Sequence, residues 1–194
     1  MKNTFIEKII KANKDKEIRS YKSNEIIFFE DQECEYASII LKGGIYMTSL
    51  YKDKEINFNY MKKGSMFGHN LLFNKNHKYK AHIVAVGNTQ ILNLNKQEFL
   101  KSLQNLNILE EYLEYMSQFT INDKETIKIL QIQKLRDRIL YILSTNFGVY
   151  RYKNITQFAN KVGVSRETLS RELVKLKNEG FISLDKNVIR ELIK

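Results

Sequence analysis

The sequence predicts an α+β fold in which a β-sheet domain precedes a long helix and a C-terminal winged helix-turn-helix. Residues 17–95 contain short runs of β-branched and aromatic residues separated by glycine and asparagine, which predicts strands joined by turns. After about residue 96 the apolar residues recur at three- and four-residue steps, which predicts helices. Hydrophobic residues make up 43% and charged residues 28% of the 194 residues, a balance typical of a globular protein.

The N-terminal segment, residues 1–14, alternates apolar and charged residues at helical spacing, so we expect a short amphipathic helix. It lacks the continuous apolar core of a signal peptide. No apolar run in the chain approaches the length needed to span a bilayer. We therefore expect a soluble, cytoplasmic protein that does not enter a membrane.

The β region is predicted to form a sandwich or barrel, because many short strands follow one another at regular spacing. Turns are expected at Gly43-Gly44 and Gly87-Asn88, among other places. With its flanking short helices this domain is assigned to residues 1–106. The predicted strands are EIIFF, YASIIL, GIYMTSLY, EINFNYM, AHIVAV and QILNLN.

A long helix is predicted over residues 107–132, after a short helix with the sequence NKQEFLKSL. Its apolar residues form a narrow stripe, which suits pairing with a second copy of the same helix. The alternative is that the stripe packs on the chain's own β domain. We expect a homodimer, since an isolated long helix has no other way to bury the stripe, although Asp123 interrupts it. The predicted dimerisation residues are Leu109, Leu113, Met116, Thr120 and Ile127.

Two helices joined by a tight turn are predicted next. Asn154 can cap the first helix and Ser165 the second. Gly163 can supply a left-handed turn between them. Ala159 and Gly163 are also small, as required where two helices cross closely.

The second of these helices is predicted to end at Gly180. Two short β runs, FISL and NVIREL, follow it and are joined by Asp185-Lys186-Asn187, which predicts a hairpin of the wing type. Together with a helix over about residues 133–146, these elements define a winged helix-turn-helix domain over residues 133–194.

Positive charge is concentrated in the last third of the chain. The formal net charge is +10, and residues 131–194 hold 13 Lys and Arg against 6 Asp and Glu. The preceding 130 residues hold 19 against 16. Such a distribution favours a polyanionic partner, nucleic acid first and an acidic membrane surface second.

The outer face of the second helix carries side chains suited to recognising bases. Arginine can bond guanine O6 and N7 together, and glutamate can accept from cytosine N4. Short hydroxyls suit phosphate. The alternative is a solvated charged face with a Glu167–Arg171 pair. The predicted DNA-contacting residues are Ser165, Arg166, Glu167, Thr168, Ser170, Arg171 and Lys175.

The chain resembles the cyclic-AMP receptor protein/FNR (Crp/Fnr) superfamily of bacterial transcription regulators. GVSRETLSREL at residues 163–173 and LKNEGFI at 176–182 carry the resemblance, with LKGGIYM at 41–47 and MKKGSMFGHNLLF at 61–73. The resemblance implies a jelly-roll-like β-roll sensor similar to cyclic-nucleotide-binding domains, a dimerising central helix and a C-terminal domain for palindromic, double-stranded promoter DNA. It also implies RNA polymerase as a partner.

The sensor departs from the family members that bind cyclic nucleotide. Those members carry Gly-Glu for the ribose and Arg-Ser for the cyclic phosphate, whereas this chain has Gly68-His69 and Tyr79-Lys80. Without arginine the phosphate loses a bidentate partner. We place the effector pocket at Gly68, His69, Tyr79 and Lys80, and we expect cyclic AMP not to bind there.

Other cofactors are limited by the residues present. The single cysteine, Cys34, excludes an iron–sulfur cluster held by four cysteines. Haem stays open, with His69 as the candidate ligand, and so does the absence of any ligand. A small β-barrel metalloenzyme would need His69, His77 and His82 to converge, but no glutamate ligand accompanies them. We therefore expect a regulator and not an enzyme.

Overall fold

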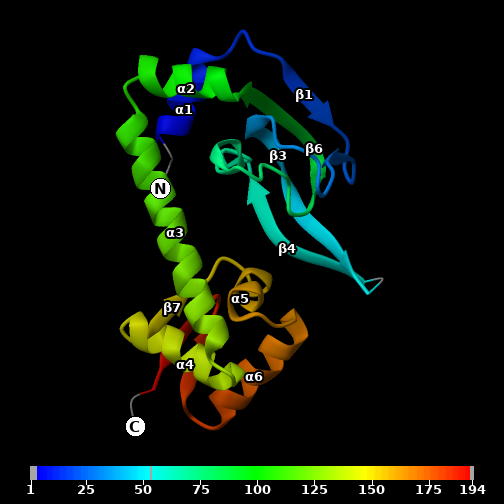
Figure 1. Ribbon diagram of the computed structural model, residues 1–194. Helices are drawn as coiled ribbons and strands as arrows, with labels where there is room; N and C mark the ends of the chain where they lie inside the picture. Colours follow the sequence, from blue (N-terminus) through cyan, green and yellow to red (C-terminus); the bar gives the residue numbers. More distant parts are fainter. Residues whose placement is uncertain (1–3, 53, 193–194) are drawn as a thin grey trace. The chain divides into compact units, whose positions relative to one another are not determined.

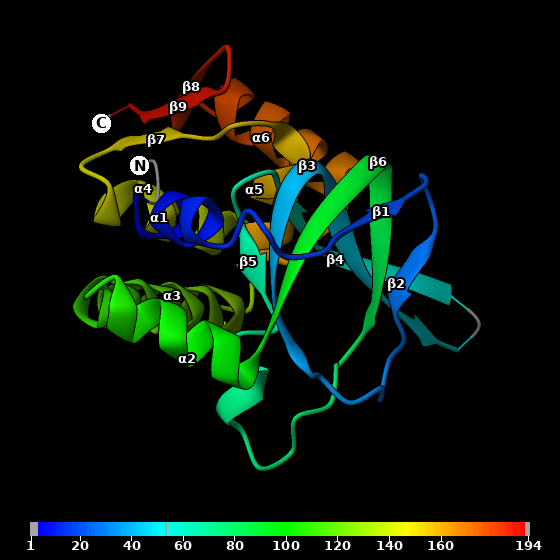
Figure 2. The same cartoon turned by 90° about the horizontal axis from the view of Figure 1, so that it is seen from above.

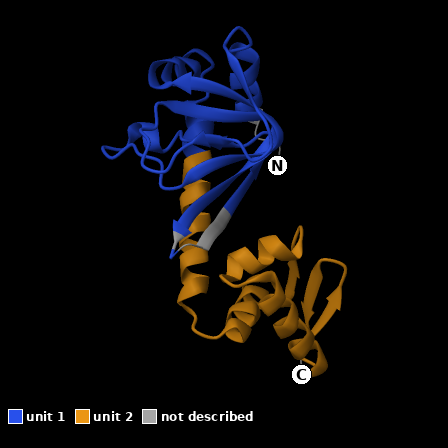
Figure 3. Cartoon of the chain, turned by 90° about the vertical axis from the view of Figure 1, so that its right-hand side faces the viewer, with its two compact units in different colours: residues 1–114 blue, residues 115–194 orange. Residues whose placement is uncertain are grey.

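The computed structural model describes residues 4–52 and 54–192 of the chain (Figure 1). The chain divides into two compact units, residues 1–114 and residues 115–194 (Figure 3). The long helix α3 (Leu109–Gln131) begins in the first unit and continues into the second.

The first unit is built on an antiparallel sheet. β1, β6, β3 and β4 are neighbours in that order, while β2 pairs with β6 and β5 pairs with β3. The helices α1 and α2 lie side by side next to these strands (Figure 2). The elements are α1 (Thr4–Ala12), β1 (Ile18–Tyr21), β2 (Ile26–Phe28), β3 (Tyr36–Tyr51), β4 (Lys54–Lys62), β5 (Met66–Phe67), η1 (Leu71–Phe73), β6 (His82–Asn95) and α2 (Lys96–Asn105).

Two predicted turns are wrong. Gly43-Gly44 lies inside β3 and Gly87-Asn88 inside β6, and the two sites face each other across the sheet. The register changes there, which marks a bulge and not the end of a strand. Gly43 has φ +72, and a Cβ on it would lie 2.6 Å from Thr89 Oγ1. The glycine thus permits close contact between two continuous strands.

The short helix α2 has an N-terminus that is fixed by local hydrogen bonds. The Asn95 side chain accepts from the backbone N–H of Glu98, and the Glu98 carboxylate accepts from the backbone N–H of Asn95. This capping box satisfies two N–H groups that would otherwise have no partner. Phe99 and Leu103 are buried and hold α2 against the core.

The second unit is a helix–turn–helix followed by a β-hairpin, as predicted. β7, β9 and β8 form a small antiparallel sheet in that order, and β7 was not predicted from the sequence. The buried side chains of this unit include Phe158, Leu169, Leu173 and Ile189. After α3 the elements are α4 (Leu135–Thr145), β7 (Val149–Arg151), α5 (Ile155–Val162), α6 (Arg166–Asn178), β8 (Ile182–Asp185) and β9 (Val188–Glu191).

Across residues 4–52 and 54–192, no helix combines the length and the apolar character that crossing a membrane requires.

Candidate nucleic-acid interface and sensor site

The predicted caps of α5 and α6 are confirmed. Asn154 Oδ1 accepts from the N–H of Gln157 at 2.8 Å. Ser165 Oγ accepts from the N–H of Thr168 at 3.2 Å and lies 2.9 Å from Thr168 Oγ1. These bonds fix where each helix begins and therefore which side chains α6 directs outward.

Gly163 makes the left-handed turn between α5 and α6, with φ +70. The prediction that its small size lets two helices of the turn cross needs correction. A Cβ on Gly163 would lie 2.5 Å from Leu130 Cδ2, so the close neighbour is a side chain of α3. Ala159 is buried in the core of the second unit.

Arg138 also holds this turn, and no pattern in the sequence indicated it. Its Nη1 donates to the Val162 carbonyl and its Nε to the Ile132 carbonyl, both at 2.7 Å. One guanidinium therefore ties the end of α5 to the joint between α3 and α4. Only the three-dimensional contact identifies this arginine among the other basic residues of the unit.

The exposed face of α6 carries most of the predicted DNA-contacting residues. Arg166, Glu167, Arg171 and Lys175 are exposed, whereas Leu169, Leu173 and Leu176 are buried. Thr168 and Ser170 are half-buried. Val174 is 52% exposed and lies one turn after Ser170, and sequence reasoning did not single it out. An apolar side chain there suits a thymine methyl group.

Charges on this face remain available to a partner. Arg171 Nε donates to the backbone carbonyl of Glu167 at 3.4 Å. The pKa of Glu167 is lowered by its own backbone N–H and by the Ser165 hydroxyl, so it stays a carboxylate at neutral pH. Charged side chains of both signs thus project from the first turns of α6.

The hairpin of β8 and β9 is anchored close to the start of α5. Asn187 takes a left-handed conformation with φ 57, and its Nδ2 donates to the Lys153 carbonyl at 3.2 Å. The Tyr152 N–H donates to the Asn187 carbonyl at 3.0 Å. These bonds bring the exposed side chains of Lys153 and Lys186 to one end of the unit.

The predicted dimerisation residues form a partly exposed row along α3. Leu109, Leu113 and Ile127 are 50%, 55% and 57% exposed. Thr120 is exposed and Met116 is half-buried.

In the sensor, Gly68 and Tyr79 are brought together in a buried position. Tyr79 stacks on Phe28, with ring centroids 4.7 Å apart, and a Cβ on Gly68 would lie 3.3 Å from the Tyr79 hydroxyl. Cys34 Sγ donates to the Gly68 carbonyl at 3.4 Å, and burial raises the pKa of this thiol. Lys80 is exposed and does not share this environment.

His69 is only 4% exposed and lies against the first turn of α3. Its Nδ1 is 3.4 Å from the Tyr112 hydroxyl, and the two rings meet edge to face. Burial lowers the pKa of His69 to about 4. An imidazole that is buried and already in contact with Tyr112 does not fit a haem ligand.

The other histidines lie in different environments. His77 is exposed, 3.9 Å from Glu33, and His82 Nδ1 accepts from the N–H of Glu30 at 3.1 Å. Within the described part of the chain, no group of three or more His, Cys, Asp or Glu side chains is arranged to hold a metal ion.

Lowering the pH from about 6.5 to about 4 is expected to destabilise the first unit through His69. The folded state keeps this imidazole neutral, while the unfolded chain binds a proton once the pH falls below about 6.5. The stability is therefore present above the unfolded pKa and lost as the pH falls through this window, by up to about 3 kcal/mol. Urea unfolding at several pH values should show that the free energy of unfolding depends less on pH in His69→Phe than in the wild type. His77→Gln serves as the exposed control, and equal slopes for wild type and His69→Phe would contradict the prediction.

A family model and solved structures both match this chain. Residues 18–105 match the family of cyclic nucleotide-binding domains. A search of curated protein sequences found no match.

Solved structures match nearly the whole chain. CprK in complex with OCPA has a TM-score of 0.71 at 16% identity, over 95% of this chain and 91% of CprK. CLP, a c-di-GMP responsive global regulator of Xanthomonas campestris, has a TM-score of 0.61 at 16% identity, over 98% and 99%. A CRP/FNR family transcriptional regulator from Thermus thermophilus has a TM-score of 0.52 at 21% identity, over 91% and 94%.

Proposed function

We propose that this chain, which has the fold of Crp/Fnr transcription regulators and carries a cyclic nucleotide-binding type of domain, is itself a sequence-specific DNA-binding regulator. In this proposal it is a cytoplasmic homodimer that binds palindromic promoter DNA, acts together with RNA polymerase and works without cyclic nucleotide. Residues 1–106 are the sensor, residues 107–132 the dimerisation helix and residues 133–194 the DNA-binding domain. The exposed face of α6 is the observation that carries the proposal.

The chemistry of that face supports base recognition. Arg166 and Arg171 can each bond a guanine edge, and Glu167 can accept from a cytosine amino group. All three lie in the first two turns of a helix that follows a tight turn, which is the part that enters the major groove in helix-turn-helix proteins. The excess of positive charge in residues 131–194 supports the attraction to phosphates.

The row of exposed apolar side chains on α3 supports the homodimer. Leu109, Leu113 and Ile127 would each leave water if a second copy of α3 packed against them. Burial of such side chains is a main source of association free energy. A two-fold dimer would also present two copies of α6 to the two halves of a palindrome.

Selection from random DNA duplexes tests the proposed function. The enriched sequence is expected to be an inverted repeat with GTGA-like half-sites whose centres lie about one helical turn apart. An enriched sequence without two-fold symmetry, or no enrichment, would contradict the proposal.

Arg171→Ala and Lys175→Ala are expected to weaken DNA binding in different ways. Loss of Arg171 should cost on the order of 1–3 kcal/mol and relax the preference at one guanine. Loss of Lys175, which lies at the edge of the face, should weaken all sequences alike and reduce the salt dependence. Titrations of matched and mismatched duplexes at several salt concentrations distinguish the two effects. Identical behaviour of both variants would show that the two residues do not divide base and phosphate contacts.

Cyclic AMP and cyclic GMP are expected not to bind and not to change DNA affinity. Tyr79 is buried near the place where the resemblance implies an arginine, and among the four pocket residues the only cation is the exposed Lys80. Burial of a phosphate diester without a paired cation is unfavourable. Calorimetry checks the prediction. Micromolar affinity for cyclic AMP that Lys80→Ala abolishes, and that Lys78→Ala leaves intact, would contradict it.

A further inference from the structure

A hollow of about 400 Å³ lies between the C-terminal end of α1 and one face of α2. This volume falls in the range of small-molecule sites, about 300–1,000 Å³. Most of the side chains that line it are polar, and they include Asn13, Lys16, Glu98, Lys101 and Ser102. The hollow is separate from the region of Gly68 and Tyr79, which do not line it.

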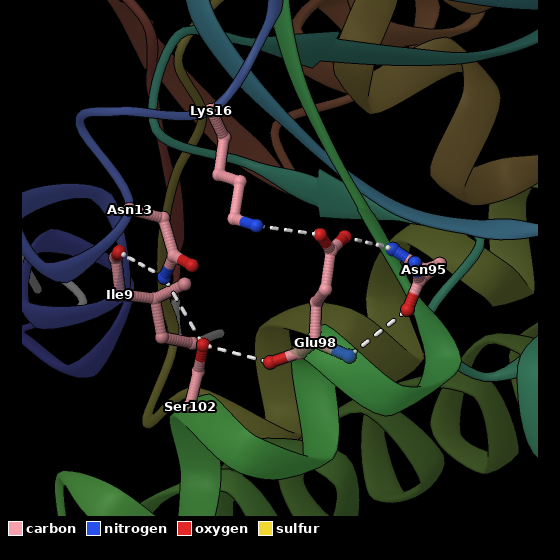
Figure 4. A network of polar contacts seen from close by, with 6 residues as sticks. All are labelled: Ile9, Asn13, Lys16, Asn95, Glu98 and Ser102. Atoms are coloured by element: carbon pink, nitrogen blue, oxygen red, sulfur yellow. Dashed lines mark hydrogen bonds and ion pairs between the residues drawn. The ribbon is translucent and has the colours of Figure 1, made fainter.

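Two buried polar side chains border the hollow. Asn13 is 8% exposed and Ser102 is 7% exposed. Asn13 Nδ2 donates to the Ile9 carbonyl at 2.9 Å and to Ser102 Oγ at 3.0 Å, and Ser102 Oγ donates to the Glu98 carbonyl at 2.9 Å (Figure 4). A carbonyl oxygen can only accept, so the amide nitrogen of Asn13 must face Ile9.

The side-chain oxygen of Asn13 therefore faces the other way. Figure 4 shows it pointing into the space bounded by Lys16, Glu98 and Ser102. It has no hydrogen-bond partner within residues 4–52 and 54–192. This oxygen is not among the fully buried side-chain atoms that lack a partner, so it is open to solvent in the hollow, where a donor on a bound molecule can reach it.

The rim of the hollow carries an excess of positive charge. Lys16 Nζ lies 2.8 Å from Glu98 Oε1, and the other carboxylate oxygen accepts from the Asn95 N–H at 3.0 Å. The hydrogen bond from Lys16, and after it the one from the Asn95 backbone, hold the pKa of Glu98 below its usual range. Glu98 therefore stays charged, and the charge of Lys16 offsets it. Lys101 is exposed at the same rim and adds a further positive charge.

We propose that this hollow binds a small carboxylate that carries an amino or hydroxyl group on the neighbouring carbon. The amino or hydroxyl group donates to Asn13 Oδ1, and the carboxylate lies between Lys16 and Lys101. The side chains of Lys16 and Glu98 are 38% and 29% exposed, and a partly exposed ion pair contributes little by itself, so Lys16 can turn toward the ligand at small cost. The site does not depend on DNA binding by α6.

Calorimetry with matched probes tests the proposal on the full chain. L-glutamate is compared with glutarate, L-malate with succinate, and both L-alanine and L-lactate with propionate, so that each pair differs in the donor group. At least one donor-bearing probe is expected to bind about tenfold more tightly than its partner. No binding below about 10 mM by any probe, or equal affinity within every pair, would overturn the proposal.

A charge reversal at the rim gives the second test. Lys101→Glu is expected to lower the affinity for the probe by about tenfold or more, since it replaces an attractive charge with a repulsive one. Lys11→Glu is the control, because Lys11 is exposed on α1 but does not line the hollow. Circular dichroism establishes that both variants are folded. Unchanged affinity in Lys101→Glu, or equal losses in both variants, would overturn the site while leaving the DNA selection result untouched.

Discussion

Replacing Leu113 by glutamate is expected to give monomers that bind the full palindrome about a hundredfold or more weakly. Leu113 is 55% exposed and lies in the row of apolar side chains along α3. A buried carboxylate at a dimer contact would lose its hydration without gaining a partner. A dimer binds both half-sites of one duplex at once, which raises its affinity about 10²–10⁴-fold. A monomer binds only one half-site and loses this gain. Light scattering and titration of a palindromic duplex measure the two effects.

The matched control is Gln118→Glu, which adds the same charge on the opposite side of α3. Gln118 is exposed, and its Nε2 donates to Asn122 within the same helix. This variant should remain a dimer and keep its affinity for the palindrome. A dimer that persists in Leu113→Glu would show that α3 is not the dimer contact, whatever its exposure.

Replacing Phe158 by alanine is expected to destabilise the second unit by about 3–5 kcal/mol, the usual range for a buried aromatic side chain. Phe158 is 1% exposed and lies against Tyr150 and Tyr152, with ring centroids 5.0 Å and 5.2 Å away. The substitution removes these contacts and leaves a cavity beneath α5. Denaturant unfolding of the whole chain should show an earlier transition for this unit, with DNA affinity lost in parallel.

Phe147→Ala is the control for this experiment. Phe147 is 99% exposed, so its removal leaves no cavity. The free energy of unfolding of Phe147→Ala should stay within about 0.5 kcal/mol of the wild-type value. Equal effects of the two substitutions would mean that the core of this unit is not organised around Phe158.

Local hydrogen-bond chemistry explains why the helix–turn–helix could be predicted well from the sequence. Asn154 and Ser165 cap α5 and α6 through partners three residues away. Gly163 and Gly180 both take the left-handed conformation after a helix. Because each of these interactions joins residues only a few positions apart, the neighbouring residues in the sequence are enough to predict them.

The β region was harder to predict because its strands are continued by partners distant in sequence. Glycine and asparagine at Gly43-Gly44 and Gly87-Asn88 favour turns locally, but pairing of β3 with β6 extends both strands through a bulge. The strand β1 has few local signals and forms because it pairs with β6. Strand formation depends on the neighbouring strand more than on local preference.

The sequence by itself determined the α+β fold, the order of its sheet, long helix and helix–turn–helix, the helix caps and the charged face of α6, since these follow from periodicity and from contacts within a few residues. Only the tertiary structure decided which side chains lose their access to water. It buried His69 against Tyr112 and Tyr79 against Phe28, and it left Lys80, the residue after Tyr79, exposed. It also brought Asn13 and Ser102, distant in the chain, to the hollow between α1 and α2. Burial and unpaired hydrogen-bonding groups depend on packing between distant segments, which residue spacing alone does not specify.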